Sequence, residues 1–303
     1  MSLYYSMQGL IGNTPLVRLN NMGIPTGVNV FAKLELYNPS GSVKDRIGKY
    51  MLEAAERDGS LKPGGVIIDA TAGNTGLGIA FAALGRGYRI VFVVPMKFSV
   101  EKQTLLRALG AEVINTPLDD GMLGASKKAA ELLAEIPGSV TLDQFTNKNN
   151  PQAHYENTGP EIYRDMDGKI DYFVAGAGSG GTFTGVMKYL KEQTPSIKGV
   201  LADPIGSTMG GGEHANYSIE GIGNDFIADT MDMTLVDSVI KINDDESFSM
   251  TRLLAKNEGI IAGSSSGAAM AAVHKLAATI KKGNIVTIFP DRGDRYFSKG
   301  LYL

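Results

Sequence analysis

The stretch DYFVAGAGSGGTFTG, residues 171–185, reads as a strand, a glycine-rich turn and the start of a helix. Gly176, Gly178 and Gly181 fit the pattern G-x-G-x-x-G, and the next apolar run ends on an acidic residue, Asp203. This combination is typical of a loop that binds the pyrophosphate of a dinucleotide. Free N–H groups at a helix start also bind other phosphates. The stretch therefore predicts a phosphate site and leaves its ligand open.

Short apolar runs alternate with helical stretches on both sides of this turn. The runs cover residues 28–35, 66–70, 89–95, 112–117, 172–178, 198–204, 239–242, 259–263 and 285–290. Continuous apolar strands flanked by helices indicate parallel strands that are buried on both faces. Repeated strand–helix units predict an α/β fold with one or two open, twisted sheets. The long glycine-rich segment 203–225 interrupts the alternation, and loops of that length are usually functional.

The composition excludes several classes of function. The 303 residues carry a formal net charge of −3 without a basic block, so no nucleic-acid partner is expected. The chain has no cysteine, which excludes disulfides, thiolate metal sites and a cysteine nucleophile. The three histidines are far apart in sequence, so we expect no metal site. No apolar run approaches the roughly 20 residues of a membrane span, and the N-terminal sequence lacks the features of a signal peptide. We therefore expect a cytoplasmic protein.

Two further strand-to-helix turns carry small and polar residues. Ligands of open α/β sheets bind beyond the carboxyl ends of the strands, so these turns are candidate sites. The turn at 71–76, TAGNTG, offers N–H groups and the Asn74 amide at a helix start. Ser264, Ser265 and Ser266 stand between an apolar run and an alanine-rich helix. We expect one of these serines to cap the helix, but a cap requires only one hydroxyl.

A lysine lies in an unfavourable place in NPSGSVKDR, residues 38–46. Ser42 is a candidate N-cap with Asp45 three residues later, which would place Lys44 near the second helical position. A cation there faces the positive end of the helix dipole, at a cost of roughly 0.3–1 kcal/mol. A broken local rule indicates a functional residue, and lysine amines form Schiff bases. We expect Arg46 and the helix start to lower the pKa of Lys44.

A Schiff-base lysine, a monophosphate site, a serine cluster and an amide-bearing anion loop together suit pyridoxal 5′-phosphate. Over essentially its whole length, the chain resembles the fold-type II pyridoxal-phosphate enzymes of cysteine and cystathionine synthesis. Seven blocks match that family in order, at residues 11–20, 38–46, 71–76, 144–162, 176–185, 220–227 and 263–269. Residues 93–103 and 294–303 are most similar to bacterial O-acetylserine-dependent cystathionine β-synthases and cysteine synthases.

The resemblance implies the roles of the site residues. Lys44 would be the Schiff-base lysine, Asn74 would bind the 3′ oxygen of the cofactor, and Ser265 would face its pyridine nitrogen. One loop would bind the phosphate: Gly178, Ser179, Gly180, Gly181 and Thr182. Another set would bind the substrate: Thr71, Ala72, Gly73, Asn74, Thr75 and Gln144, with Gly221, Ile222 and Gly223 at the entrance for the second substrate. Ala72 stands where many members have serine, which removes a hydroxyl beside the reacting carbon.

The resemblance also implies a tryptophan synthase β-like architecture with a cofactor cleft between two parallel-sheet domains. The smaller, substrate-binding domain would hold residues 1–12 and 35–147, and the larger, cofactor-binding domain residues 13–34 and 148–303. The implied reaction is β-replacement on O-acetylserine, and less well on serine, through an aminoacrylate. Homocysteine would then give cystathionine, sulfide would give cysteine, or both; the alternative is a strict cysteine synthase. A homodimer without haem is expected.

Two readings from other classes compete with this one. A nicotinamide dehydrogenase would use Gly176–Gly181 and Asp203, but it leaves Lys44, the 71–76 turn and the three serines unexplained. A non-catalytic relative would act only as a binding partner. The retention of Lys44 and of all three loops argues against that second alternative.

Overall fold

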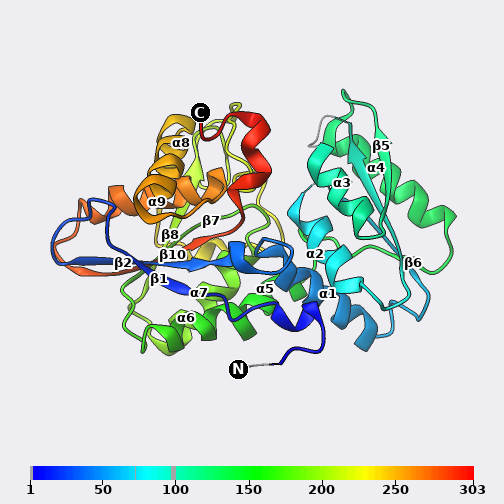
Figure 1. Ribbon diagram of the computed structural model, residues 1–303, viewed down its shortest axis with the longest axis horizontal. Coiled ribbons are helices and arrows are strands. Elements are labelled where there is room, and N and C mark those ends of the chain that lie inside the picture. The colour runs from blue at the N-terminus through cyan, green and yellow to red at the C-terminus, as the bar shows by residue number, and fades with distance from the viewer. Residues whose placement is uncertain (1–2, 72, 97–99) are drawn as a thin grey trace.

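The computed structural model describes residues 3–71, 73–96 and 100–303 of the chain. Two β-sheets lie side by side, each covered by helices on both faces (Figure 1). Both sheets are built mainly from parallel strands, as the alternation of apolar runs and helices predicts. Within the described ranges, no helix is long and apolar enough to cross a membrane.

The larger sheet has six strands in the order β1-β2-β10-β7-β8-β9. Their bounds are β1 Leu16–Leu19, β2 Val28–Leu34, β7 Tyr172–Gly176, β8 Lys198–Pro204, β9 Ser238–Ile242 and β10 Gly283–Phe289. All neighbours pair in parallel except β1, which runs antiparallel to β2. The sequence pattern did not predict β1, because its four residues are half-buried or exposed apart from Leu19 and form no apolar run.

Helices from the second half of the chain cover the larger sheet. They are α5 (Asn149–Ala153), α6 (Gly159–Asp165), α7 (Gly181–Gln193), α8 (Asp244–Leu253) and α9 (Ser264–Ala277). Helix α9 packs with β2 and β10 in one apolar core, and α7 packs with β7 on the opposite face. Short helical turns occupy the connections: η1 (Met7–Leu10), η2 (Glu35–Tyr37), η3 (His154–Thr158), η4 (Met233–Leu235), η5 (Leu254–Glu258) and η6 (Gly293–Lys299).

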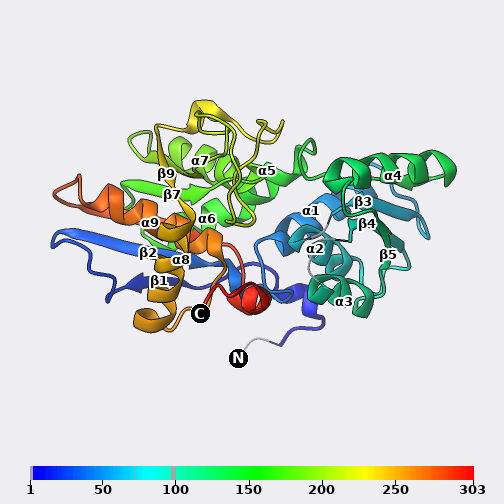
Figure 2. The ribbon, with the colours of Figure 1, turned by 90° about the horizontal axis from the view of Figure 1, so that it is seen from above.

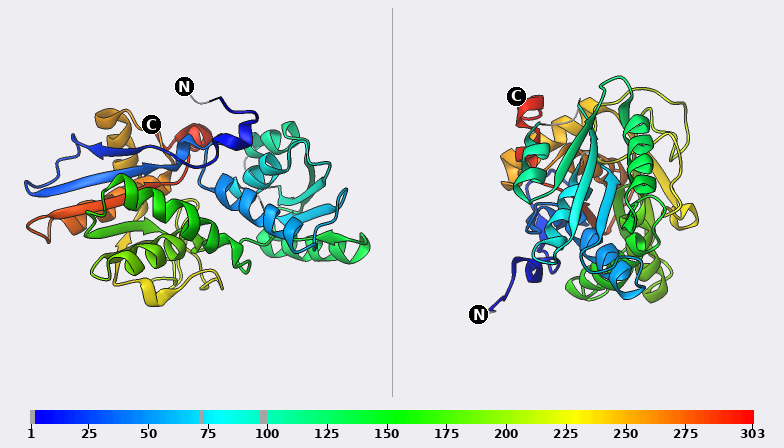
Figure 3. Two further views of the ribbon diagram at one scale, coloured as in Figure 1. Left: turned by 90° about the horizontal axis from the view of Figure 1, so that it is seen from below. Right: turned by 90° about the vertical axis from the view of Figure 1, so that its right-hand side faces the viewer.

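The smaller sheet has four parallel strands in the order β5-β4-β3-β6. Their bounds are β3 Val66–Ala70, β4 Arg89–Pro95, β5 Glu112–Thr116 and β6 Ser139–Val140. The helices are α1 (Lys44–Arg57), α2 (Asn74–Ala83), α3 (Val100–Ala108) and α4 (Gly121–Glu135). Helix α4 lies on one side of this sheet and α3 on the other (Figure 3).

Helices α1 and α2 cross between the two sheets (Figures 1 and 2). Glycine permits the close crossing: a Cβ on Gly48 would lie 2.4 Å from the carbonyl carbon of Gly78. A Cβ on Gly78 would lie 2.3 Å from the carbonyl oxygen of Lys44. Any side chain at either position would push the helices apart. The crossing therefore fixes the first turn of α1 beside α2, at the boundary of the two sheets.

Three local predictions were wrong. The run 259–263 forms only an isolated bridge between Ala262 and Arg292, because the left-handed Gly259 ends η5 and α9 begins at Ser264. Gly263, not a serine, is the N-cap of α9, and the three serines are its first helical residues. Val43, not Ser42, precedes α1, so Lys44 is the first helical residue.

Candidate active site

A cavity of about 850 Å³ opens between the two sheets, next to the residues that follow β3 and β7. Many of the predicted site residues line it together: Lys44, Thr71, Gly73, Asn74, Thr75, Gln144, Gly178, Ser179, Gly221, Ile222 and Gly223. Gly180 follows Ser179 as the N-cap of α7, and Gly181 and Thr182 are the first two residues of that helix. Ala72 lies outside the described residues. The fold thus gathers segments from Lys44 to Gly223, which are 179 positions apart in sequence.

Lys44 opens helix α1 and its amine faces a desolvated environment. Burial lowers the pKa of Lys44 to about 8, and the carboxylate of Asp291 partly opposes that shift. The backbone N–H of Lys44 donates to Ser42 Oγ at 3.3 Å. An amine with this pKa is partly neutral near physiological pH, so it can act as a nucleophile or accept a proton.

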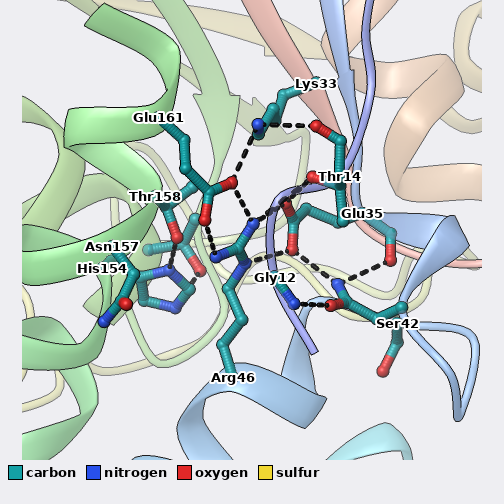
Figure 4. Close-up of polar contacts among 12 residues, drawn as sticks. Gly12, Thr14, Lys33, Glu35, Ser42, Arg46, His154, Asn157, Thr158 and Glu161 are labelled. Atoms are coloured by element: carbon teal, nitrogen blue, oxygen red, sulfur yellow. Dashed lines mark hydrogen bonds and ion pairs between the residues drawn. The ribbon is translucent and has the colours of Figure 1, made fainter. Parts of the chain in front are cut away.

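Arg46 does not contribute to that shift in the predicted way. Its guanidinium turns away from the cavity and forms a buried network with Glu35 and Glu161 (Figure 4). The Arg46 Nε to Glu35 Oε2 and Arg46 Nη2 to Glu161 Oε2 distances are both 2.7 Å. Fully buried Lys33 adds a contact of 2.9 Å from its Nζ to Glu161 Oε2. This network joins α1 to β2 and α6 of the larger sheet.

Asn74 is the first residue of α2, and its amide has a fixed orientation. Its Nδ2 donates to Asp291 Oδ2 at 2.7 Å, and its Oδ1 accepts a hydrogen bond from Arg295. Tyr296 also donates to Asp291. Burial raises the pKa of Asp291, against the hydrogen bonds from Tyr296 and Asn74. Sequence reasoning missed Asp291 and Arg295, although the terminal block that contains Arg295 was part of the resemblance.

Thr75 and Gln144 meet at the side of the cavity formed by the smaller sheet. Thr75 Oγ1 donates to Gln144 Oε1 at 2.8 Å. Because the amide oxygen is occupied, the Gln144 NH₂ group is the part left to donate toward a ligand. Buried Thr71 lies at the end of β3, and Gly73 is the N-cap of α2. These groups and the first N–H groups of α2 form a site suited to a carboxylate.

The glycine-rich loop between β7 and α7 is a close-packed cradle. Gly180 has φ +84°, and a Cβ there would lie 2.4 Å from Met231 Cβ. A Cβ on Gly178 would lie 2.6 Å from the Gly221 carbonyl oxygen. The first N–H groups of α7 have no intrahelical partner, so they are available to an anion. Thr182 Oγ1 lies 3.1 Å from Nε2 of His154, whose pKa burial lowers well below its usual value.

The long loop after β8 closes the cavity from the side of the larger sheet. Gly223 N donates to Ala177 O, and Asn224 Nδ2 donates to Gly178 O, both at 2.7 Å. Glu220 accepts from Lys102 at 3.1 Å and also contacts Lys299. The loop therefore holds the cradle on one side and bridges to α3 on the other.

The serine cluster begins helix α9 at the larger sheet. Ser264 lines the cavity and its Oγ accepts from Glu220 N at 3.0 Å. Ser265 is 4% exposed, one residue deeper in the helix. Ser266 Oγ is buried and has no hydrogen-bond partner among the described residues.

The alternative of a dinucleotide site requires that Asp203 bind a ribose, and the structure does not allow this. The Asp203 carboxylate is 1% exposed and accepts from Lys241 Nζ at 2.5 Å and from Gly210 N at 3.0 Å. A buried, paired carboxylate is not available to a ribose. A metal centre is also unsupported: in the part of the chain that the structure describes, no group of three or more His, Cys, Asp or Glu side chains could hold an ion.

The arrangement fits pyridoxal phosphate on its own chemistry. A partly neutral lysine amine lies in a cavity that also has a glycine cradle, in which a Cβ at 178 or 180 would clash with neighbouring atoms. The cradle suits a monophosphate, and the Asn74 amide and the serine cluster supply uncharged polar groups around the space for a ring.

Comparisons with known proteins agree with this chemistry. A family model described as pyridoxal-phosphate dependent enzyme matches residues 7–291. An O-acetylserine dependent cystathionine beta-synthase of Bacillus subtilis is 48% identical over 303 residues, covering 100% of this chain and 99% of its own length. A cysteine synthase of Helicobacter pylori is 46% identical and covers 100% of both chains. The crystal structure of O-acetylserine dependent cystathionine beta-synthase from Helicobacter pylori has a TM-score of 0.95 at 45% identity, over 100% of each chain.

Proposed function

This chain belongs to the pyridoxal-phosphate dependent enzymes, and from that premise we propose that it catalyses β-replacement on O-acetylserine. Homocysteine as nucleophile gives cystathionine, and sulfide gives cysteine. Family membership confirms the predicted fold class and cofactor. The observation that carries the proposal is Lys44, with a pKa of about 8, in one cavity with the glycine cradle and the Thr75–Gln144 pair.

Each group of residues has one task in this proposal. The cofactor, bound at Lys44, supplies an electron-accepting ring that makes the Cα proton of an amino acid acidic. Thr71, Thr75, Gln144 and the start of α2 orient the substrate carboxylate. Residues 178–182 bind the phosphate, Asn74 the 3′ oxygen, and Ser265 the pyridine nitrogen. The Lys44 amine takes the proton from Cα, because its pKa lies near the working pH. Gly221, Ile222 and Gly223 border the path of the nucleophile.

The alternative within this class is a strict cysteine synthase that uses sulfide only. Both kinds of relative match the full length of the chain, with 48% and 46% identity. Identity alone therefore does not separate them. The deciding experiment supplies O-acetylserine with homocysteine and with sulfide in parallel and identifies the products by mass. Cystathionine formation supports the wider reading, cysteine alone supports the narrower one, and neither product would overturn the proposal.

We expect O-acetylserine to be a much better substrate than serine. Acetate leaves without help, whereas hydroxide needs a proton delivered to it, and Ala72 has no hydroxyl that could relay one. The measurement is kcat/KM for both amino acids in the natural protein and in Ala72→Ser. Equal use of serine by the natural protein would refute the leaving-group argument. An unchanged ratio in Ala72→Ser would assign the preference to another part of the site.

Replacing Gly180 with valine is expected to remove the bound cofactor. The left-handed φ of +84° and the 2.4 Å approach to Met231 exclude a branched side chain unless the cradle moves. A loss of about 1.4 kcal/mol already weakens binding tenfold, and we expect at least that. Cofactor content per purified chain is the readout. Gly85→Ala is the control, because Gly85 has φ +75° and no atom of the described residues lies within 4 Å of the added Cβ. Undiminished cofactor in Gly180→Val would remove this loop from the phosphate site.

The proposal includes the domain division 1–12 plus 35–147 and 13–34 plus 148–303. It is supported by the two sheets, whose strands separate along those boundaries. It also includes a homodimer in the cytoplasm. Exposed apolar side chains near the N-terminus, at Leu3, Tyr4, Tyr5 and Met7, support a second copy as partner. Light scattering of the purified protein measures its mass in solution, and a monomer at micromolar concentration would contradict the dimer.

A further inference from the structure

We propose that Asn150 is a positioning residue that fixes the position of Gln144 relative to the phosphate loop at residues 178–182. This inference rests on the proposed roles of Gln144 and Ser179. Asn150 is the second residue of α5 and is completely buried. It is not one of the residues proposed above to bind the cofactor or the substrate. It lies in the segment between the two sheets, where the chain passes from the smaller one to the larger one.

The side-chain amide of Asn150 joins two separate parts of the cavity wall. Its Nδ2 donates to the backbone oxygen of Gln144 at 2.7 Å and to Ser179 Oγ at 2.9 Å. The Gln144 carbonyl can only accept a hydrogen bond, so the NH₂ group of Asn150 must face it. This fixes the orientation of the amide. Its Oδ1 is buried without a hydrogen-bond partner among the described residues. A buried acceptor without a partner costs about 1–3 kcal/mol. The two donated bonds offset this cost, and they therefore set the position of the side chain.

The two hydrogen bonds also set the polarity of the groups that face the cavity. Ser179 Oγ accepts from Asn150, which leaves the hydroxyl hydrogen of Ser179 to point elsewhere, and Ser179 lines the cavity. An anion in the cradle would accept that hydrogen. On the other side, Gln144 Oε1 accepts from Thr75, which leaves its NH₂ group as the donor. Both walls therefore present donors, as a phosphate and a carboxylate require.

A second residue makes a parallel connection. Thr230 is 2% exposed, and its Oγ1 lies 2.5 Å from Ser179 O and 3.3 Å from Gln144 O. Gly181 must be glycine for the same packing, because a Cβ there would lie 2.0 Å from Asn150 Oδ1. Asn150 and Thr230 thus link the same two segments from different elements. A residue that merely filled space would not donate to both.

The role predicts one signature: a single substitution outside both ligand sites should weaken both of them. In Asn150→Asp the side chain keeps its size but loses the donors, and Ser179 turns its hydrogen toward the new carboxylate. One lost hydrogen bond of about 1–1.5 kcal/mol corresponds to roughly tenfold. We expect pyridoxal phosphate to bind the apo protein at least about tenfold more weakly. We expect KM for O-acetylserine to rise about tenfold at saturating cofactor, with kcat within about threefold.

The experiment titrates apo protein with pyridoxal phosphate by absorbance and then measures KM and kcat at saturating cofactor. Asn149→Asp is the matched control, since it adds the same charge one residue earlier on α5, where the side-chain amide donates to Asn147 Oδ1 rather than to either ligand site. If Asn150→Asp does not fold, the affinity for pyridoxal phosphate and KM for O-acetylserine are measured in Asn150→Ala and Thr230→Val instead. The proposal would be overturned if the affinity for pyridoxal phosphate and KM for O-acetylserine both stayed within twofold of the parent. It would equally be overturned if the substitution lowered the free energy of unfolding and changed neither constant. A parent without turnover on O-acetylserine would refute the proposed function, while the cofactor titration would still test the bond to Ser179.

Discussion

Replacing Lys44 with alanine is expected to abolish turnover and the covalent attachment of pyridoxal phosphate. Within the described lining of the cavity, the other lysines are Lys102 and Lys299, and both contact Glu220. Neither is therefore placed to substitute for Lys44. Removal of the group that transfers the proton should cost at least about 10²–10⁴-fold in kcat. The measurements are steady-state turnover and the visible absorbance of the purified protein.

The same substitution should leave the fold intact. Burial lowers the pKa of Lys44 to about 8 from an unfolded value of 10.5, so the folded apo protein binds the proton less tightly. Between about pH 8 and 10.5 the unfolded chain holds more protons, and the stability contributed at this position rises with pH across that window. Below it the buried ammonium is a net cost. Lys44→Ala removes that cost, so the apo variant should unfold in urea no earlier than the parent at pH 7.

Lys49→Ala is the control, because Lys49 lies on the same helix and does not line the cavity. It should retain both activity and cofactor. Substantial turnover by purified Lys44→Ala would remove Lys44 from the reaction. A variant that loses activity only because it unfolds would be recognised from the urea midpoint.

The elements that could be predicted are those with a strong local signal. β3, β4 and β8 begin and end at the predicted residues, because each is a continuous apolar run between polar or glycine-rich turns. β1 gave no such signal, since it is an antiparallel edge strand that is exposed along much of its length. The run 259–263 gave a misleading one, because its apolar residues form a short connection in which only a single bridge to the described residues, between Ala262 and Arg292, is made.

The parts of the site that could be predicted are those in which one short segment of sequence contains the functional residues. The turn after β3 in the smaller sheet and the segments after β7 and β8 in the larger sheet meet at one cavity, because the carboxyl ends of the strands in both sheets face the space between the sheets. The partners of those loops could not be predicted, since Asp291 and Arg295 reach Asn74 from more than 200 positions away. Arg46 shows a further limit. Residues two apart on a helix point in different directions, so proximity to Lys44 in sequence did not bring it to the cavity.

Because its side chain points away from the cavity to Glu35 and Glu161, Arg46 stabilises the fold. Replacing Arg46 with methionine is therefore expected to destabilise the protein strongly. Arg46 is 5% exposed and donates to both Glu35, which is completely buried, and Glu161. Methionine fills similar space but removes the guanidinium from both carboxylates, and Glu161 keeps its contact with Lys33. Breaking a buried pair from one side costs about 3–5 kcal/mol. Arg46→Lys should be intermediate, because one ammonium cannot reproduce the planar fork of donors. Urea unfolding of the apo proteins gives the free energies.

The matched control is Arg89→Met, which removes an arginine that also pairs with a carboxylate, Glu112. Those side chains are 49% and 51% exposed, so the cost should stay below about 1 kcal/mol. A small effect in both variants would show that the buried network contributes no more than a surface pair.

The pH dependence distinguishes this network from loss of packing. Burial alone would raise the pKa of Glu161, but the hydrogen bonds and charge of Arg46, with the charge of Lys33, outweigh it and lower the value to about 2. Glu35 is shifted in the same direction, because Arg46 outweighs the effect of burial. Such carboxylates stabilise the fold above their unfolded pKa of about 4.5, and that contribution falls away as the pH drops toward 2. Without Arg46 the buried carboxylates take up protons at a higher pH than in the parent, so the gap in free energy of unfolding between parent and Arg46→Met should shrink as the pH falls from 7 toward 2. A gap that is constant with pH would mean that methionine costs the protein packing rather than charge.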